Sequence, residues 1–595
     1  MQYPLRPLLV CMCEMAGIVD DEEIARIIAE SDSDWASESD DSFQTSLESD
    51  SSVPDKKPKV TVHRDSASSA SDESESDTAS GDWKEITDGD DTKTHNLKYS
   101  ELQGPKHAPP QGASPLSYFY MFFTVQLLQE IVVQTNNYAR QFHLNHMVLS
   151  PHSRARKWKD LTLAELKGFI ACILNMGLER RPTIASYWYT TASQYCPWFH
   201  DMFPRDRFQL ILKFFHMVDN KNLAASGEQG YDPCAKFQPL VDHANTVFRH
   251  YYTPHQQLSV DESLVGTKNH TQLLQYLPNK HHHRWGIKLW MLCDAVTNYC
   301  LAFFVYQGAK RTEDKDAIQK YGLAHTVVMK LLKMGNYICK GYHVFMDNFF
   351  MSVPLAEDLY KLSTYVTGTI RRNRKFLPQA FQNKFEVGEK KYFRKGPILA
   401  AAFREKKSQR LPVLLLSTHS KAEDTQSVRV RHGKQKHVIK PSIVQSYNDF
   451  MGGVDASDAM LYSYLDERRT VKYWKKIAFN IFSRMILNSY IIYKQNLSAG
   501  CNAMSRLDYT IKIVDALSKE WLEEKNSEVG ILGTNNVEND TKLIRKLPAK
   551  KEKDCCVCSK RTKNGPVKRR RSRTVCVKCE KGLHGECFPK HKCSK

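Results

Sequence analysis

The last 41 residues limit the fold of this chain more than any other segment, because paired cysteine and histidine residues crowd them. The pairs are Cys555-x-x-Cys558, Cys576-x-x-Cys579, His584-x-x-Cys587 and His591-x-Cys593. Eight ligands in four pairs match two tetrahedral Zn²⁺ ions. A segment this short builds no stable core unaided, so we expect bound metal to hold it together. The competing interpretation is a tail of reduced, free cysteines.

An interleaved arrangement, as in RING and PHD domains, assigns the eight ligands to two ions. One ion takes Cys555, Cys558, His584 and Cys587, and the other takes Cys576, Cys579, His591 and Cys593. Cys556 is an alternative to Cys555, although Cys556-x-Cys558 is tightly spaced. A RING-type ubiquitin ligase is a competing hypothesis, but it needs an exposed hydrophobic partner surface, whereas the loop of this module is basic.

That loop carries a basic run between the first two CxxC pairs, with Lys568, Arg569, Arg570 and Arg571 in succession. Such a run indicates phosphate contact, a nuclear import signal read by an import receptor, or both, and predicts a nuclear location. The charge of the whole chain agrees. Residues 1–112 hold 10 basic and 25 acidic residues, and the rest holds 75 basic against 41 acidic ones. So basic a body favours nucleic acid as its partner.

No membrane partner is expected, because the apolar runs 169–178 and 299–306 are too short to span a bilayer. Residues 1–112 are predicted to be a disordered acidic tail, since their Ser/Asp/Glu runs contain few apolar residues. Helical periodicity follows in 113–256, where Thr162-Leu-Ala-Glu165 is a capping box. Strand patterns and helical patterns then mix from 257 onward, with helices expected at 316–334 and 353–361, which predicts an α/β layer fold.

Three acidic positions follow strand or turn patterns. Asp261 follows the run 257–260, and Asp347 follows the run 342–346. Asp455 follows Met451-Gly-Gly-Val454 at the start of a helix, with Asp458 one turn later. Each acid alone is more typical of a turn or a helix cap. Together they predict an oxygen-lined site for two Mg²⁺ ions, which clamp the attacking and leaving oxygens of a phosphoryl transfer.

The blocks around these acids resemble the signature blocks of piggyBac-type transposases. They read Val260-Asp-Glu-Ser-Leu264, Met346-Asp-Asn-Phe-Phe350 and Tyr447-Asn-Asp-Phe-Met-Gly-Gly-Val-Asp455-Ala-Ser-Asp458. Arg284-Trp-Gly-Ile-Lys288, Gly368-Thr-Ile-Arg-Arg-Asn-Arg374 and Tyr473-Trp-Lys-Lys476 add to the likeness. The lead-in Lys280-His-His-His283 departs from the family pattern, and a partly charged, DNA-facing loop is the favoured interpretation over a metal site.

The resemblance implies a multidomain α/β architecture in which an inserted β-rich domain splits an RNase H-like domain. Helical segments on both sides form a dimerisation and DNA-binding domain, and a two-zinc domain ends the chain. The expected order is a tail at 1–112, helices at 113–256, RNase H-like parts at 257–371 and 438–460 around an insertion at 372–437, helices at 461–535, a linker at 536–553 and the cysteine-rich domain at 554–595.

The resemblance also implies residue roles. Asp261, Asp347 and Asp455 hold the Mg²⁺ ions and Asp458 assists them, while Arg372 and Lys375 contact phosphates and Trp474 stacks near the cleavage site. The implied reaction is strand cleavage and transfer at TTAA by a homodimer bound to double-stranded transposon ends. The alternative is a domesticated, catalytically silent DNA- or chromatin-binding protein that keeps its acids by inheritance.

Overall fold

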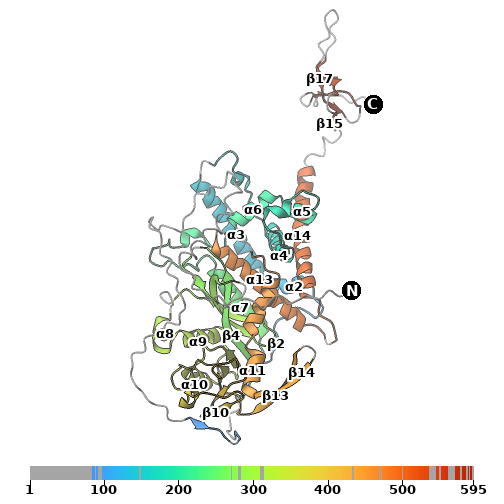
Figure 1. Cartoon of the computed structure of the whole chain (residues 1–595). Coiled ribbons are helices and arrows are strands. Elements are labelled where there is room, and N and C mark those ends of the chain that lie inside the picture. Colours follow the sequence, from blue (N-terminus) through green and yellow to red (C-terminus); the bar gives the residue numbers. More distant parts are fainter. Residues whose placement is uncertain are drawn as a thin grey trace, which may run out of the picture.

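The computed structural model describes residues 83–591, except for 88, 91–96, 147–148, 270, 279–282, 309–313, 432–433, 468–469, 471, 499, 535–543, 549–550, 560–569, 577–578, 585–586 and 588–589. One large sheet crosses the body, and helices cover it (Figure 1). Its strand order is β1 (Lys84–Glu85), β10 (Lys390–Lys395), β11 (Ile398–Phe403), β12 (Val413–Ser417), β9 (Tyr365–Thr369), β8 (His343–Met346), β4 (Gln257–Gly266), β6 (Trp285–Asp294) and β5 (Leu274–Tyr276), and β7 (Cys300–Val305) also pairs with β6.

Helices precede, interrupt and follow these strands. In chain order they are α2 (Pro115–Phe122), α3 (Val125–Asn145), α4 (Leu163–Leu178), α5 (Pro197–Met202), α6 (Arg205–Phe214), α7 (Gln238–Tyr251), α8 (Lys315–Tyr321), α9 (Leu323–Gly335), α10 (Val353–Lys361), α11 (Ser442–Phe450), α12 (Gly453–Ser463), α13 (Tyr473–Gln495) and α14 (Arg506–Thr534). Shorter strands are β2 (Gly104–Pro105), β3 (Tyr252–Thr253), β13 (Asp424–Arg431), β14 (Lys434–Pro441), β15 (Ile544–Lys546), β16 (Lys553–Asp554), β17 (Arg571–Ser572) and β18 (Thr574–Cys576).

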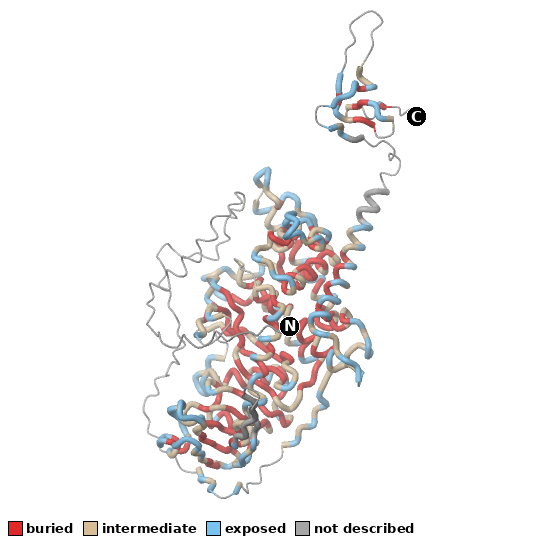
Figure 2. The backbone as a smooth tube through the Cα atoms, turned by 45° about the vertical axis from the view of Figure 1, so that its right-hand side comes forward, coloured by how far each residue is buried: buried red, intermediate tan, exposed pale blue. Residues whose placement is uncertain are grey.

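The helices that precede the sheet pack against the two long helices near the C-terminus. Gly168 of α4 lies so close to α14 that a Cβ there would be 2.6 Å from the Trp521 ring, and the Trp521 indole donates to the carbonyl of Met202. Tyr118 of α2 meets Tyr493 of α13 edge-on. Buried residues run continuously through these helices and the sheet (Figure 2). Helical segments far apart in the sequence therefore form one unit.

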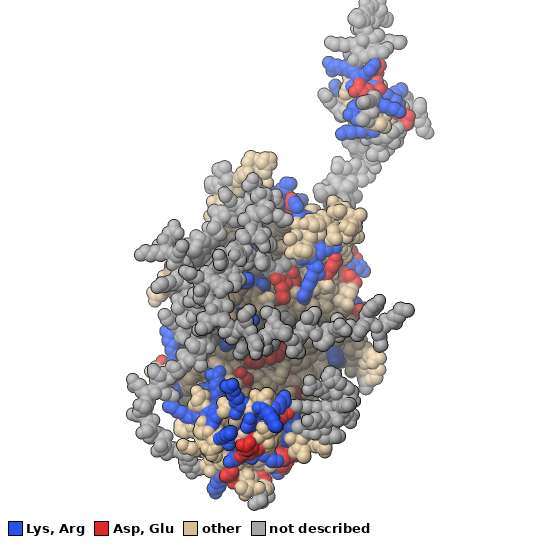
Figure 3. Space-filling view, viewed as in Figure 1, with Lys and Arg blue, Asp and Glu red and all other residues tan. Residues whose placement is uncertain are grey.

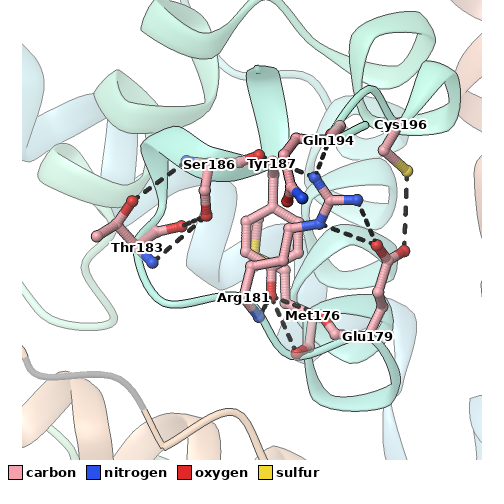
Figure 4. Close-up of polar contacts among 8 residues, drawn as sticks. All are labelled: Met176, Glu179, Arg181, Thr183, Ser186, Tyr187, Gln194 and Cys196. Carbon is pink, nitrogen blue, oxygen red and sulfur yellow. Dashed lines mark hydrogen bonds and ion pairs between the residues drawn. The ribbon is translucent and has the colours of Figure 1, made fainter. Parts of the chain in front are cut away.

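The end of α4 is tied both to its own loop and to α12. The Arg181 guanidinium donates to the Glu179 carboxylate at 2.6 Å and to the Gln194 carbonyl at 2.6 Å (Figure 4). Arg180 donates to the Tyr462 carbonyl at the end of α12. Gly177 packs directly on the backbone of Tyr464, where a Cβ would overlap the carbonyl oxygen. The helical unit thus holds α12 in place.

Local sequence signals are accurate at several element ends. The Thr162 hydroxyl accepts from the Glu165 amide at 3.1 Å, as the capping box predicts. The Glu165 carboxylate does not complete the box, because it pairs with Arg207 instead. The single helix predicted over 316–334 breaks at Gly322, whose φ of +85° separates α8 from α9.

The region predicted to be an inserted β-rich domain adds strands to the central sheet. β12 pairs with β9 in antiparallel register, so β10, β11 and β12 extend that sheet, and β13 and β14 form a separate hairpin. The predicted boundary of the acidic tail at 112 is wrong, because β1 pairs with β10 and Asp90 forms an ion pair with Arg394. Residues 1–82 lie outside the described residues.

Within the described residues, no single helix is long and apolar enough to cross a membrane. α2 and α3 pass that test only as a pair bent by 62°.

Candidate active site and metal centre

Asp261 and Asp347 lie side by side at the centre of the sheet. β4 and β8 are parallel, and Val260 is the register partner of Met346, so the two aspartates are the next residues along each strand. Neighbouring strands are about 4.8 Å apart, and laterally paired residues of parallel strands point to the same face. Two carboxylates 86 positions apart in the sequence therefore share one face of the sheet.

α11 and α12 cover this face. The Ser259 hydroxyl donates to the Met451 carbonyl between the two helices, and a Cβ on Gly453 would lie 3.0 Å from that of Ser259. The Phe345 ring packs on Phe450 at 5.1 Å. Asp455 belongs to the exposed side of the first turn of α12. Three separate elements thus bring Asp261, Asp347 and Asp455 to one side of the sheet.

These acids are less tightly gathered than the metal-binding groups of the C-terminal domain. Among the described residues, Asp261, Asp347 and Asp455 do not form a set whose ligand atoms all lie within 4.8 Å of one another.

Burial raises the pKa of Asp347, and the Glu262 carboxylate raises it further, while the Phe349 amide and Arg371 act in the opposite direction. The Phe349 amide donates to Asp347 Oδ1 at 2.8 Å. A cation at this position would therefore favour the ionised carboxylate. Carboxylate oxygens are the ligands that Mg²⁺ prefers, so the donor set fits that ion.

The basic residues nearest Asp347 are not the two that the sequence predicts. Arg371 donates to the Asn348 side chain at 3.1 Å, and Arg374 donates to the Phe349 carbonyl at 2.7 Å. Arg372 instead turns to the side-chain oxygen of Gln382 at 2.9 Å. The predicted Lys375 is exposed. Sequence reasoning missed Arg371 and Arg374, although both belong to the Gly368–Arg374 block that it singled out.

Asp458 lies in the same helix as Asp455 but in a different environment. Its Oδ1 accepts from Ser263 Oγ at 2.9 Å and from Arg484 Nη2 at 2.7 Å. The Arg484 side chain is 0% exposed and that of Asp458 is 13% exposed. The pair joins α12, α13 and β4 beneath the candidate site, which favours a structural role for this acid.

The assignment of Trp474 to base stacking is wrong for this conformation. Trp474 is 3% exposed, and its ring stacks against Phe215 and packs on His216. The indole belongs to the helical core, because the face of α13 that carries it is covered by residues at the end of α6. Of the three histidines at 281–283, only His283 is described, and it pairs with Glu467 at 2.6 Å.

The C-terminal domain brings its cysteines and histidines into two groups, interleaved as the sequence predicts. Cys555, Cys558, His584 and Cys587 form one group, and Cys576, Cys579 and His591 form the other. Cys593 lies outside the described residues. Burial would raise the pKa of Cys555, but backbone amides of Cys558, His584 and Val557 lower it to about 6. The Cys555 thiol is therefore suited to bind metal as a thiolate.

Two other residues of this domain bear on the sequence predictions. Cys556 is outside both groups, and its Sγ lies 3.4 Å from His591 Nδ1, while Cys579 Sγ lies 3.3 Å from Nε2 of the same ring. Of the predicted basic run, Arg570 and Arg571 are described and exposed, and Lys568 and Arg569 lie outside the described residues.

Comparison with known proteins gives consistent matches. A family model described as "Transposase IS4" matches residues 114–490. Human PiggyBac transposable element-derived protein 2 is 25% identical over 402 residues, which are 64% of this chain and only 62% of that protein. Human PiggyBac transposable element-derived protein 3 is 23% identical over 520 residues, or 83% and 80% of the two chains. The cryo-EM structure of a piggyBac transposase synaptic complex with hairpin DNA matches with a TM-score of 0.61 and 23% identity, over 82% of this chain and 98% of that one.

Proposed function

Since the chain belongs to the piggyBac transposase family, we propose that it is a metal-dependent DNA transposase that cleaves and joins strands at TTAA sites. The observation that carries the proposal is the lateral pairing of Asp261 with Asp347 beneath the helix that bears Asp455. The strand order β7-β6-β4-β8-β9, in which β4, β8 and β9 are parallel and β6 and β7 antiparallel to their neighbours, supports an RNase H-like core.

In this proposal, Asp261, Asp347 and Asp455 hold two Mg²⁺ ions. When bound, these ions would supply Lewis acidity that stabilises the negative charge developing on the phosphate. Asp261 and Asp347 are fixed by strand register, so their main chain needs no rearrangement. Arg371 and Arg374 lie beside Asp347 and are suited to hold a DNA phosphate in line with the acids. Such contacts position the backbone and do not read its sequence.

The remaining parts of the proposal concern DNA capture. Lysine and arginine side chains gather over the lower part of the face in Figure 3, around β10 and α10, with acidic side chains among them. The two Cys/His groups would each hold a structural Zn²⁺, with Cys593 as the fourth ligand of the second group. The basic run 568–571 would serve DNA contact and nuclear import, and the protein would act as a homodimer in the nucleus.

A silent DNA- or chromatin-binding protein is the second candidate, favoured by the absence, among the described residues, of a group that holds all three carboxylates within 4.8 Å of one another. A strand-transfer assay separates the two. TTAA-flanked duplex ends and a TTAA target plasmid are incubated with Mg²⁺ and the intact chain, the Asp347→Asn variant or the Asp449→Asn variant. Asp449 is an exposed acid on α11 that accepts from Gln445 at 2.8 Å, so it is a matched control outside the proposed site.

We expect joining by the intact chain and by Asp449→Asn, and loss of joining by Asp347→Asn. Asp347→Asn should also be at least as stable as the intact chain without metal, because the substitution removes a buried charge. If all three proteins bind DNA equally and none joins it, the silent protein is the correct interpretation.

A further inference from the structure

A cavity lies at the opposite end of the parallel strands β4 and β8 from Asp347. It has a volume of about 370 Å³, and its walls are the N-terminal segment around 101–107, the end of α7 with β3, and the loop 335–342. That loop leads into the start of β8, whereas Asp347 follows the end of β8. The cavity is therefore separate from the candidate active site.

Basic side chains dominate the lining of this cavity. They are Lys106, His107, Arg249, His250 and Lys340, against the single acid Glu101. Lys340 Nζ lies 3.2 Å from Glu101 Oε1, so the one carboxylate is already shared with one cation. Glu101 also acts on Lys106, so a single carboxylate faces two lysines and an arginine among the lining residues.

Internal contacts hold these side chains in place. Lys106 donates to the Arg249 carbonyl at 2.8 Å, and Arg249 donates to the Met334 carbonyl at 3.0 Å. The His107 and His250 rings stack at 4.8 Å. The cluster is thus arranged before any ligand binds, which lowers the entropy cost of binding.

The cations also disturb one another. Burial lowers the pKa of Lys106, Glu101 opposes that shift, and the charges of Lys340 and Arg249 lower the pKa further. Burial, His107 and Lys106 likewise lower the pKa of His250. A bound anion would relieve this repulsion.

We propose that the cavity binds a phosphate group, with Lys106, Arg249 and Lys340 neutralising its charge. Phosphate fits better than a carboxylate because it offers more acceptor oxygens and more charge to donors that approach from several walls. The cavity is large enough for a diphosphate. The phosphate comes either from a small free compound or from a DNA backbone.

Calorimetric titration of the full chain with inorganic pyrophosphate tests the site. Lys340→Gln and Arg249→Gln should each weaken binding roughly tenfold or more, the usual effect of losing a hydrogen bond to a charged group. Lys395→Gln is the matched control, because Lys395 forms a similar ion pair with Glu357 at 3.1 Å and is 31% exposed, against 29% for Lys340. It should leave pyrophosphate binding unchanged.

The melting temperature of Lys340→Gln supplies a second readout. Without ligand it should stay close to that of the intact chain, because the lost ion pair with Glu101 is partly exposed. With pyrophosphate the thermal stabilisation of this variant should be smaller than that of the intact chain. A variant that is simply misfolded would melt lower in both conditions.

Competition by duplex DNA identifies the source of the phosphate. If DNA displaces pyrophosphate and Lys340→Gln weakens DNA binding, the ligand is the DNA backbone. If DNA does not displace pyrophosphate, the ligand is a free phosphate compound. The proposal is overturned if pyrophosphate does not bind, or if Lys395→Gln weakens binding as much as Lys340→Gln.

Discussion

The buried pair between Asp458 and Arg484 gives the sharpest test of which acids stabilise the fold. In Asp458→Asn, the Arg484 guanidinium stays 0% exposed but loses its only carboxylate contact among the described residues. Its Nε already has no partner there, and its other contacts are Ser263 Oγ and Met291 Sδ. Removing one partner of a buried ion pair costs about 3–5 kcal/mol. The neighbouring Asp455→Asn should cost about 1 kcal/mol or less, because Asp455 is exposed and the interactions of an exposed carboxylate contribute little to stability.

Urea denaturation followed by tryptophan fluorescence measures both variants under the same conditions. A double variant, Asp458→Asn with Arg484→Met, removes both charges and should recover most of the lost free energy of unfolding. The reasoning is refuted if Asp458→Asn is no less stable than Asp455→Asn. It is also refuted if the double variant is no more stable than Asp458→Asn alone.

Three further predictions follow from packing, titration and metal binding. Gly177→Ala should lower the free energy of unfolding by about 1–3 kcal/mol, although alanine favours helices, because its Cβ would overlap the Tyr464 carbonyl. The control is Gly452→Ala, whose Cβ would meet no atom within 4 Å and which should not lower the melting temperature comparably. The hydrogen bond to Asp294 raises the pKa of His255, so the stability it contributes is present below pH about 6.5 and lost as pH rises through the raised value. In His255→Gln, the free energy of unfolding from urea denaturation should fall less between pH about 5 and 9 than it does in the intact chain. An unchanged dependence on pH would contradict this role of His255. A strong chelator should make 551–591 sensitive to protease while the body stays resistant, and digestion of both would contradict independent folding of the terminal domain.

Short-range signals in the sequence were enough to define several local features. The ligand groups of the C-terminal domain follow from spacing, because two residues between cysteines leave little freedom in how the thiols meet. The helix predicted at Val353–Lys361 has those bounds in the structure. The short strand pattern ahead of Asp347 also matches β8, whereas only the pairing of β8 with β4 places Asp347 beside Asp261.

Features that depend on which surface covers a residue were beyond the sequence. The residues that adjoin Trp474 in the sequence are the same whether its ring faces DNA or Phe215. Only the packing of the folded chain buries the ring against Phe215. In the Gly368–Arg374 block, Arg371 and Arg372 are adjacent and chemically identical. Only the fold decides that the Arg371 side chain acts on Asp347 while the Arg372 side chain turns to Gln382.

The sequence by itself thus determined the chemistry available to this protein, its carboxylates, its thiols and its basic charge, because side-chain identity and short spacing are local properties. Tertiary structure decided which acid pairs with a buried arginine, which strands join one sheet, and that five basic residues from three distant segments line a single cavity. Those outcomes depend on contacts between separate elements of the chain, whose free energies exist only once the chain has folded.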